Sequence, residues 1–372
     1  MEFSLGEDQQ SIIELSRKIF RDRYPADRPS PANVGLDRAT WQVLADAGLL
    51  GLCLDEQHGG SGLELALLAD VLEAQGLVLA PVPLLESSAA AQVLQRCGNA
   101  AVTGAWLADS VSGTRILGLA LDGLVSADPR GQLQIQGDTA TLDGTWDHVP
   151  YGRDLDAVLV VARTATGEPA LVLVPTASAG VSIDEAWGSH ALPWDQLQVK
   201  GASLDASLVL ARGDAAEEAL AWLVPLLLTG LSALQLGVVS EALERTARYT
   251  CERQQFKRPI ASFQAVLHRA ADGYIDREAL RSTVWQAAWR LGQGRDAALQ
   301  ARAAKWWACE AGHRIGHSAQ HLHGGIGSDL EYPIHRYFLW AKQIEFTLGG
   351  ASQQLAQLGN HLATHQFEGF PL

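Results

Sequence analysis

The sequence contains few of the residues that build disulfide frameworks and metal centres. Its 372 residues include only four cysteines, and no two of them have the Cys-x-x-Cys spacing. Scattered thiols of this kind are typical of the reduced core of a cytosolic protein, so we expect neither a disulfide framework nor a cysteine zinc site. The four cysteines are Cys53, Cys97, Cys251 and Cys309.

Positive charge is also scarce. The chain has 28 lysines and arginines against 42 acidic residues, a net charge of −14, and no basic run. This balance argues against a surface for nucleic acid or for an anionic membrane. The first residues, MEFSLGEDQQ, are acidic and polar, unlike a secretory signal. We therefore expect a cytoplasmic protein.

One stretch has no charge at all. No charged residue occurs from position 219 to position 240, a length that could cross a bilayer. However, Pro225, Gly230 and Gln235 interrupt it, and the helical pattern continues into the polar sequence EALERTARY. A helix that is apolar all round can be either a membrane span or a buried helix. We predict a buried helix of a bundle, and no membrane partner.

The hydrophobic periodicity divides the chain into three parts. Hydrophobic residues make up 47% and charged residues 19%, a globular composition. Apolar positions recur at helical spacing up to about residue 113, short β-rich runs follow to about residue 212, and helical spacing then returns. The predicted fold class is α+β, mostly α. It has an N-terminal helical domain (1–113), a middle antiparallel β-barrel or sandwich (114–212) and a C-terminal helical domain (213–372).

Two stretches of the C-terminal part carry a family resemblance. The first, at 321–352, opens with paired glycines, Gly324 and Gly325, and closes on a second pair, Gly349 and Gly350. The second, RYTCERQQFKRPIASFQAVLHRAAD, is similar in spacing to an Arg-x-x-Phe-Gly motif. Together they resemble acyl-CoA dehydrogenases, flavoenzymes that desaturate acyl-CoA thioesters between Cα and Cβ. The glycine loop and helix at 55–76 also resemble that family's N-terminal domain.

The resemblance implies a set of cofactor-binding residues. In homotetrameric members, the arginine and phenylalanine of the motif reach a neighbour's FAD across an interface. Here the matching residues are Arg253 and Phe256. Gly324 and Gly325 would approach the same pyrophosphate with backbone N–H groups, and His321 stands where the family usually has glutamine. An arginine fork and backbone N–H groups suit a pyrophosphate.

One departure concerns the motif itself, since Lys257 replaces its usual glycine. Each residue also has a plain structural interpretation. Arg253 could be a surface arginine paired with Glu252, Phe256 could be ordinary core, and His321 could be a helix-end histidine. It is the ordered combination of the two motifs that favours the cofactor interpretation.

The family's chemistry needs a carboxylate that removes the α-proton of the thioester. The resemblance places this base in one of two positions, and Gly349 occupies the first. No Asp or Glu occurs between Glu345 and Glu368, nor between Glu218 and Glu241, so both positions are empty. The family's Thr-Glu-Pro…Gly-Ser-Asp run, which wraps the flavin, is also missing from 118–132. No catalytic residue is therefore predicted.

These observations give one hypothesis and two alternatives. The chain is predicted to be the non-catalytic subunit of a heterotetrameric acyl-CoA dehydrogenase, similar to bacterial enzymes that shorten steroid side chains. A homologous partner subunit would carry the base and share FAD, with acyl-CoA as substrate and an acceptor such as an electron-transfer flavoprotein. The first alternative is an active homotetramer whose base is Glu345, Glu241 or Asp329; the second is a flavin-free scaffold. His313 and His317 lie one helical turn apart without a third ligand, so no metal site is predicted.

Overall fold

The computed structural model describes residues 6–25, 34–125 and 130–364. Its N-terminal part is helical, as predicted. Local sequence explains several helix ends: the Asp37 side chain accepts a hydrogen bond from the Thr40 N–H (2.9 Å) at one start, and Gly48 (φ 73°) follows the end of the same helix. The elements are α1 (Glu7–Arg23), α2 (Arg38–Asp46), η1 (Glu56–His58), α3 (Leu65–Val78), α4 (Leu84–Cys97) and α5 (Ala100–Val111).

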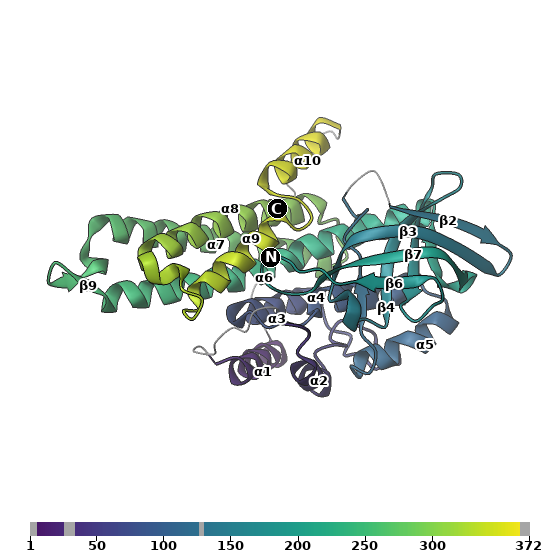
Figure 1. The fold of residues 1–372 in the computed structure, drawn as a ribbon, viewed down its shortest axis with the longest axis horizontal. Coiled ribbons are helices and arrows are strands. Elements are labelled where there is room, and N and C mark those ends of the chain that lie inside the picture. Colours follow the sequence, from purple (N-terminus) through teal and green to yellow (C-terminus); the bar gives the residue numbers. More distant parts are fainter. Residues whose placement is uncertain (1–5, 26–33, 126–129, 365–372) are drawn as a thin grey trace.

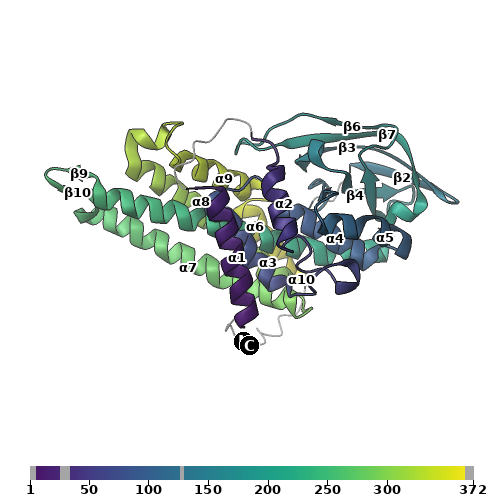
Figure 2. The ribbon, with the colours of Figure 1, turned by 90° about the horizontal axis from the view of Figure 1, so that it is seen from below.

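The middle part is one eight-stranded sheet in the order β6-β7-β3-β2-β4-β5-β8, with β1 pairing beside β4. Figure 1 shows it at one end of the molecule, and Figure 2 shows α4 and α5 covering one of its faces. The strands and short helices are β1 (Leu117–Leu119), β2 (Gly131–Gln136), β3 (Thr139–Pro150), η2 (Gly152–Asp154), β4 (Ala157–Thr164), β5 (Pro169–Pro175), β6 (Val181–Asp184), β7 (Trp194–Asp205), η3 (Ala206–Leu208) and β8 (Val209–Arg212).

The sheet corrects one detail of the prediction, because it is an open mixed sheet and not a closed antiparallel barrel. β2 pairs antiparallel with β3, and β4 with β5, as expected for hairpins. However, β4 lies beside β2 and β1, and both of those pairs are parallel. The burial of β4 fits a strand covered on both faces, since every residue from Ala157 to Ala162 is buried.

The C-terminal part is a helical bundle built around α6, which packs against α3, α4, α7, α8 and α9. The bundle thereby unites the two helical parts of the chain (Figure 1). Its elements are α6 (Asp214–Glu252), β9 (Gln254–Gln255), β10 (Arg258–Pro259), η4 (Ile260–Ser262), α7 (Gln264–Gly292), α8 (Ala298–His323), η5 (Gly324–Ser328), α9 (Ile334–Phe346) and α10 (Ala351–Thr364).

Glycines set the close contact between α3 and α6. A Cβ on Gly76 would lie 2.1 Å from the Leu234 carbonyl oxygen, and a Cβ on Gly237 would lie 2.1 Å from that of Glu73. Only glycine permits this approach of two backbones. α6 is long and apolar enough to cross a membrane, but 89% of its most apolar window is buried inside the protein. The charge-free stretch is therefore a core helix.

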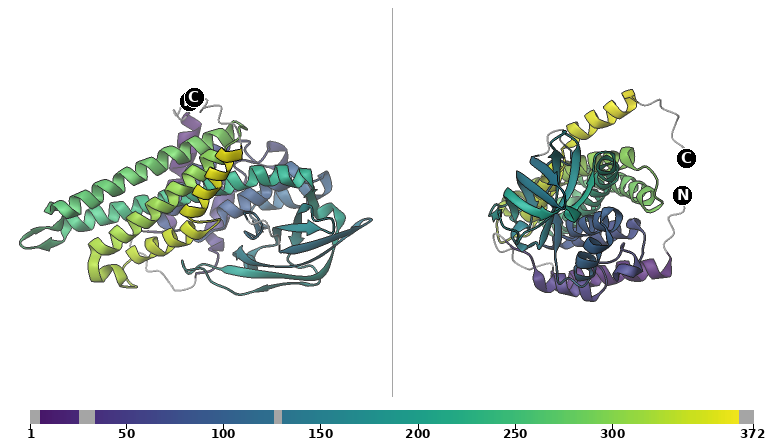
Figure 3. Two further views of the ribbon diagram at one scale, coloured as in Figure 1. Left: turned by 90° about the horizontal axis from the view of Figure 1, so that it is seen from above. Right: turned by 90° about the vertical axis from the view of Figure 1, so that its right-hand side faces the viewer.

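The last helix leaves the body of the bundle. Figure 3 shows α10 extending away from its neighbours, and Gln354 is its one buried residue within the part of the chain that the structure describes. The turn that connects α9 to α10 contains Leu348 (φ 55°) and Gly349 (φ 97°). This turn includes the position at which the family resemblance places the catalytic base.

Candidate functional site

The predicted arginine motif folds into a β-hairpin at the end of α6. Gln255 pairs with Arg258, so the loop consists of Phe256 (φ 52°) and Lys257 (φ 66°). A two-residue loop with both residues at positive φ is a turn type that favours Asn and Gly, not Phe and Lys. The turn leaves the Phe256 ring 88% exposed, with only an edge-on contact to Phe263 at 6.2 Å. Strained backbone of this kind tends to occur at functional sites.

Arg253 begins this hairpin. Its backbone N–H donates to the Tyr249 carbonyl at 2.8 Å, which ends α6, and its side chain is exposed. The structure, over the residues that it describes, gives Arg253 no ion pair with Glu252 or with any other acid. The guanidinium therefore faces outward, where it can meet another molecule.

The glycine pair lies at the end of α8. Gly324 takes φ 63° and ψ −140°, a conformation that favours glycine, and a Cβ on Gly324 or Gly325 would meet nothing within 4 Å. Both residues are exposed, so a ligand can reach this backbone. His321, also exposed, lies with Nδ1 3.0 Å from Nη1 of Arg269 on α7. The sequence analysis missed Arg269, although it directly follows the motif residue His268.

The ends of α6 and α8 are held together by an aromatic contact. The Tyr249 ring stacks on the His323 ring with centroids 4.4 Å apart, and its hydroxyl donates to the His323 carbonyl at 3.4 Å. The hairpin of Arg253 therefore starts beside the turn of Gly324. Figures 1 and 2 show both segments at the end of the bundle opposite the sheet.

The structure thus brings the five predicted cofactor residues to one exposed end of the molecule. We call them the cofactor edge: Arg253, Phe256, His321, Gly324 and Gly325. Their chemistry fits a dinucleotide, because a guanidinium and the backbone N–H of Gly325 can bind phosphates and an aromatic ring packs on a flat surface. The Gly324 N–H already donates to the carbonyls of Gln320 and His321 at the end of α8. Their outward orientation fits a ligand that another subunit holds.

A fully buried lysine organises the turn at Gly349. Lys305 Nζ donates to the carbonyl oxygens of Ile344 (2.9 Å), Glu345 (3.1 Å) and Gly349 (3.2 Å). Burial lowers the pKa of this lysine. A cation at the carbonyl end of α9 satisfies carbonyls that have no partner within the helix, and it suits the helix dipole.

The turn also disfavours a side chain at position 349. The residue takes φ 97°, and a Cβ there would lie 2.6 Å from Oε1 of the exposed Gln353 side chain, which would have to move. The adjacent Gly350 is different, because the nearest atom to its added Cβ is the Glu345 carbonyl oxygen at 3.9 Å. The structure therefore specifies glycine at the position where the resemblance places the base.

A small pocket joins this turn to the sheet. It has a volume of about 250 Å³, and Leu348 and Leu124 both line it. The two regions in which the sequence lacks the family's flavin and base motifs thus meet at one place. Residues 126–129 lie outside the described chain; among the described lining residues there are amides, apolar groups and a guanidinium, and no carboxylate. Those residues are Leu124, Val125, Arg302, Leu348, Gln353, Gln354 and Gln357.

Asp122, which precedes the lining residues Leu124 and Val125 in the chain, already has hydrogen-bond partners. Asp122 accepts hydrogen bonds from the backbone N–H of His148 and from its ring Nδ1, both at 2.9 Å. Burial opposes ionisation of Asp122, but these bonds and the nearby Arg130 lower its pKa overall. The same hydrogen bond raises the pKa of His148. Asp122 is thus stabilised as an ionised partner of His148.

The three alternative bases each have local partners. Glu345 lies 2.6 Å from Lys342 Nζ and 3.7 Å from His313 Nδ1, and Glu241 lies 2.8 Å from Arg245 Nε. Asp329 accepts the Glu331 N–H at 2.9 Å in an exposed turn. None of the three lines the pocket beside Gly349.

The histidine pair at one turn's spacing gives no metal site. The His313 and His317 rings are 4.5 Å apart, but no group of three His, Cys, Asp or Glu residues is arranged to hold a metal within the described ranges. The interaction of His313 is with Glu345 and Lys342.

Comparison with known proteins agrees with this geometry. Residues 6–114 match the acyl-CoA dehydrogenase N-terminal domain, and residues 229–363 match the C-terminal domain of the same family. The acyl-CoA dehydrogenase FadE27 of Mycobacterium tuberculosis is 42% identical over 336 residues, which cover 88% of each chain.

Solved structures extend the likeness to almost the whole chain. A chain of the ChsE4-ChsE5 complex of Mycobacterium tuberculosis matches with 39% identity and a TM-score of 0.90, covering 98% of this chain and all of that one. A variant of the Tcur3481-Tcur3483 steroid acyl-CoA dehydrogenase matches with 41% identity and a TM-score of 0.87, covering 97% and 99%. The fold class and the resemblance that the sequence predicted are confirmed: the chain belongs to the acyl-CoA dehydrogenase family.

Proposed function

We propose that this chain is the non-catalytic subunit of a heteromeric acyl-CoA dehydrogenase. The observation that carries the proposal is the turn at Gly349, where a carboxylate is absent and the backbone takes φ 97°, a conformation that favours glycine. The reaction of the family requires a base that removes the α-proton of the thioester. In this account a homologous partner subunit supplies that carboxylate.

The cofactor edge is the chain's contribution to the partner's active site. Arg253 would pair with the pyrophosphate of FAD, the backbone N–H of Gly325 would donate to it, and Phe256 would pack on the dinucleotide. Gly324, without a side chain, would let the phosphate approach this turn closely. His321 would donate a further hydrogen bond, oriented by Arg269 at 3.0 Å. FAD, when bound, supplies the hydride-accepting chemistry of the family.

The substrate class is proposed from the relatives. One relative is named as a steroid acyl-CoA dehydrogenase, and two of the matching structures are complexes of two different chains. We infer a bulky acyl-CoA ester, such as a steroid side-chain CoA ester, with an electron-transfer flavoprotein as the acceptor and the cytoplasm as the location.

Turnover by the separate chains tests the proposal. The complete chain, purified alone and mixed with FAD and an acyl-CoA, should give no desaturation, whereas its complex with a base-carrying homologous subunit should be active. In that complex, substitution of the partner's carboxylate should abolish turnover, and Glu345→Gln or Glu241→Gln in this chain should leave it unchanged. Turnover by this chain alone that is lost in Glu345→Gln or Glu241→Gln would instead establish a relocated base.

A further inference from the structure

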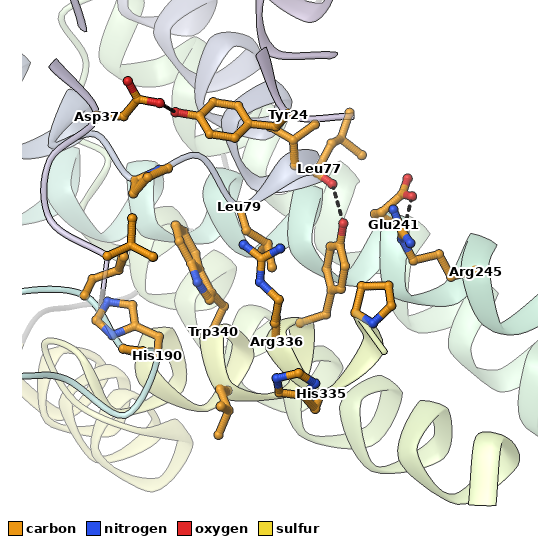
Figure 4. Close-up of a pocket in the computed structure, with 18 of the residues that line it drawn as sticks. Tyr24, Asp37, Leu77, Leu79, His190, Glu241, Arg245, His335, Arg336 and Trp340 are labelled. Atoms are coloured by element: carbon orange, nitrogen blue, oxygen red, sulfur yellow. Dashed lines mark hydrogen bonds and ion pairs between the residues drawn. The ribbon is translucent and has the colours of Figure 1, made fainter. Parts of the chain in front are cut away.

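A second and larger pocket lies away from both regions described above. It has a volume of about 410 Å³ and lies between the end of α1, the link from α3 to α4, the loop from β6 to β7, α6 and α9. It shares no residue with the cofactor edge or with the pocket beside Gly349. The volume is in the range of small-molecule sites. Figure 4 shows side chains from these separate segments converging on it.

Part of the pocket lining is apolar. Leu77, Leu79 and Leu192 line it together with the Trp340 indole. The His190 ring packs edge-on against Trp340 with centroids 5.6 Å apart, and burial lowers its pKa to about 3. The imidazole is therefore neutral at physiological pH and extends the uncharged wall (Figure 4).

Among the lining residues that the structure describes, arginines outnumber acids. Three arginines, Arg21, Arg245 and Arg336, line the pocket with two acids, Asp37 and Glu241. Both acids already have a cationic partner. Asp37 lies 3.6 Å from Arg23 and accepts a hydrogen bond from Tyr24, while Glu241 lies 2.8 Å from Arg245.

Arg336 is the arginine best placed to meet a ligand. In Figure 4 its guanidinium extends from α9 into the pocket, beside Trp340 and toward Leu79. Because the whole chain has a net charge of −14, a pocket with excess positive charge is a local exception. It would favour an anionic ligand over a neutral one.

Backbone strain also gathers at this pocket. Among the described residues, six that are not glycine take positive φ, and two of them, Leu79 (φ 55°) and Ala191 (φ 62°), line the pocket on opposite segments. Positive φ is costly for a leucine or an alanine, and such strain is typical of ligand-binding segments. It gives a second reason, independent of charge, to expect a ligand here.

We propose that this pocket is a binding site for an amphipathic carboxylate. The hydrocarbon body packs against Leu77, Leu79 and Trp340, and the carboxylate accepts hydrogen bonds from the Arg336 guanidinium. A guanidinium binds a carboxylate with two parallel N–H···O bonds. The site is separate from the flavin chemistry and does not depend on the proposed function.

Calorimetric titration of the complete chain with decanoate and with decan-1-ol tests this site. The two probes have the same chain length and differ in charge. Decanoate should bind with one site per chain, at least about tenfold more tightly than the alcohol, because a charge-assisted pair is worth that much. Arg336→Met should remove this preference and leave alcohol binding unchanged. The matched control Arg295→Met, at an exposed loop arginine, should bind as the wild type does.

A second variant separates the pocket from non-specific binding. Leu339→Trp places an indole in the pocket and should abolish binding of both probes, with folding checked by circular dichroism. Three results would each overturn the proposal. They are no saturable decanoate binding below about 1 mM, equal effects of Arg336→Met and Arg295→Met, or unchanged binding in folded Leu339→Trp.

Discussion

A Cβ on Gly349 would lie only 2.6 Å from Oε1 of Gln353. In the same turn, Lys305 Nζ donates a hydrogen bond to the carbonyl oxygen of Gly349 at 3.2 Å. Together with the positive φ of Gly349 (97°), the contact with Gln353 means that a carboxylate side chain at this position would require the turn to adjust.

Gly349→Glu should destabilise the chain by about 1–3 kcal/mol. The glutamate would have to adopt the positive φ of this position, and its side chain would displace Gln353. Gly350→Glu is the matched control, because its Cβ would have space, and its cost should be below about 1 kcal/mol. Denaturant unfolding of the two variants measures the difference. Equal stabilities would show that the turn tolerates a side chain at position 349.

Lys305→Met should destabilise the chain by about 1–3 kcal/mol. The substitution preserves the length of the side chain but removes the ammonium that donates to the carbonyls of Ile344, Glu345 and Gly349. Cys309 Sγ still donates to Glu345 and Gln354 Nε2 to Gly349, so the main cost is the buried Ile344 carbonyl, which loses its side-chain donor. The exposed Lys200→Met is the control and should change stability by less than about 0.5 kcal/mol. A similar small effect in both variants would mean that Lys305 does not hold the turn.

The Asp122–His148 pair should make stability depend on pH. Because the pKa of His148 is raised in the folded state, its contribution is complete below the unfolded pKa of about 6.5 and is lost as pH rises through the raised value. The difference in melting temperature between wild type and His148→Gln should thus be larger at pH 6 than at pH 9. The effect should stay below about 1 kcal/mol because the ring is partly exposed. A difference that is the same at both pH values would exclude the pair as its cause.

The sequence predicted the parts of the fold that local patterns determine. The charge-free stretch at 219–240 was predicted to be a buried bundle helix, and it lies in α6, whose most apolar window is 89% buried. The open sheet was not predicted, because the parallel pairing of β4 with β2 joins strands that are not adjacent in the chain. Strand alternation shows which face is buried but not which strands become neighbours.

Local sequence motifs also allowed the residues of the candidate site to be proposed, whereas contacts between distant parts of the chain could not be foreseen. Arg253, Phe256 and the glycine pair stand in ordered motifs, so their chemistry could be recognised from the sequence. Arg269 and Lys305 could not, since each contacts a residue of another helix, 52 and 39 positions away along the chain. One local signal existed for Lys305: it lies on the face of α8 that also presents the buried Ala301 and Cys309.

Arg253→Ala should lower the flavin content of the proposed heteromeric complex several-fold, although the proposal assigns the base to the other chain. The loss of one guanidinium–phosphate interaction weakens binding by about tenfold or more. Absorbance of the purified complex measures flavin per protein, and Arg295→Ala serves as the control at an arginine outside the cofactor edge. Full flavin content in Arg253→Ala would show that this edge does not contact FAD.

The central claim is that this chain completes a flavin site without housing one of its own. Counting FAD in the purified complex with a base-carrying homologous subunit tests it most directly. The account predicts one FAD for each pair of unlike chains. Two FAD per pair, or a full equivalent on this chain purified alone, would contradict it.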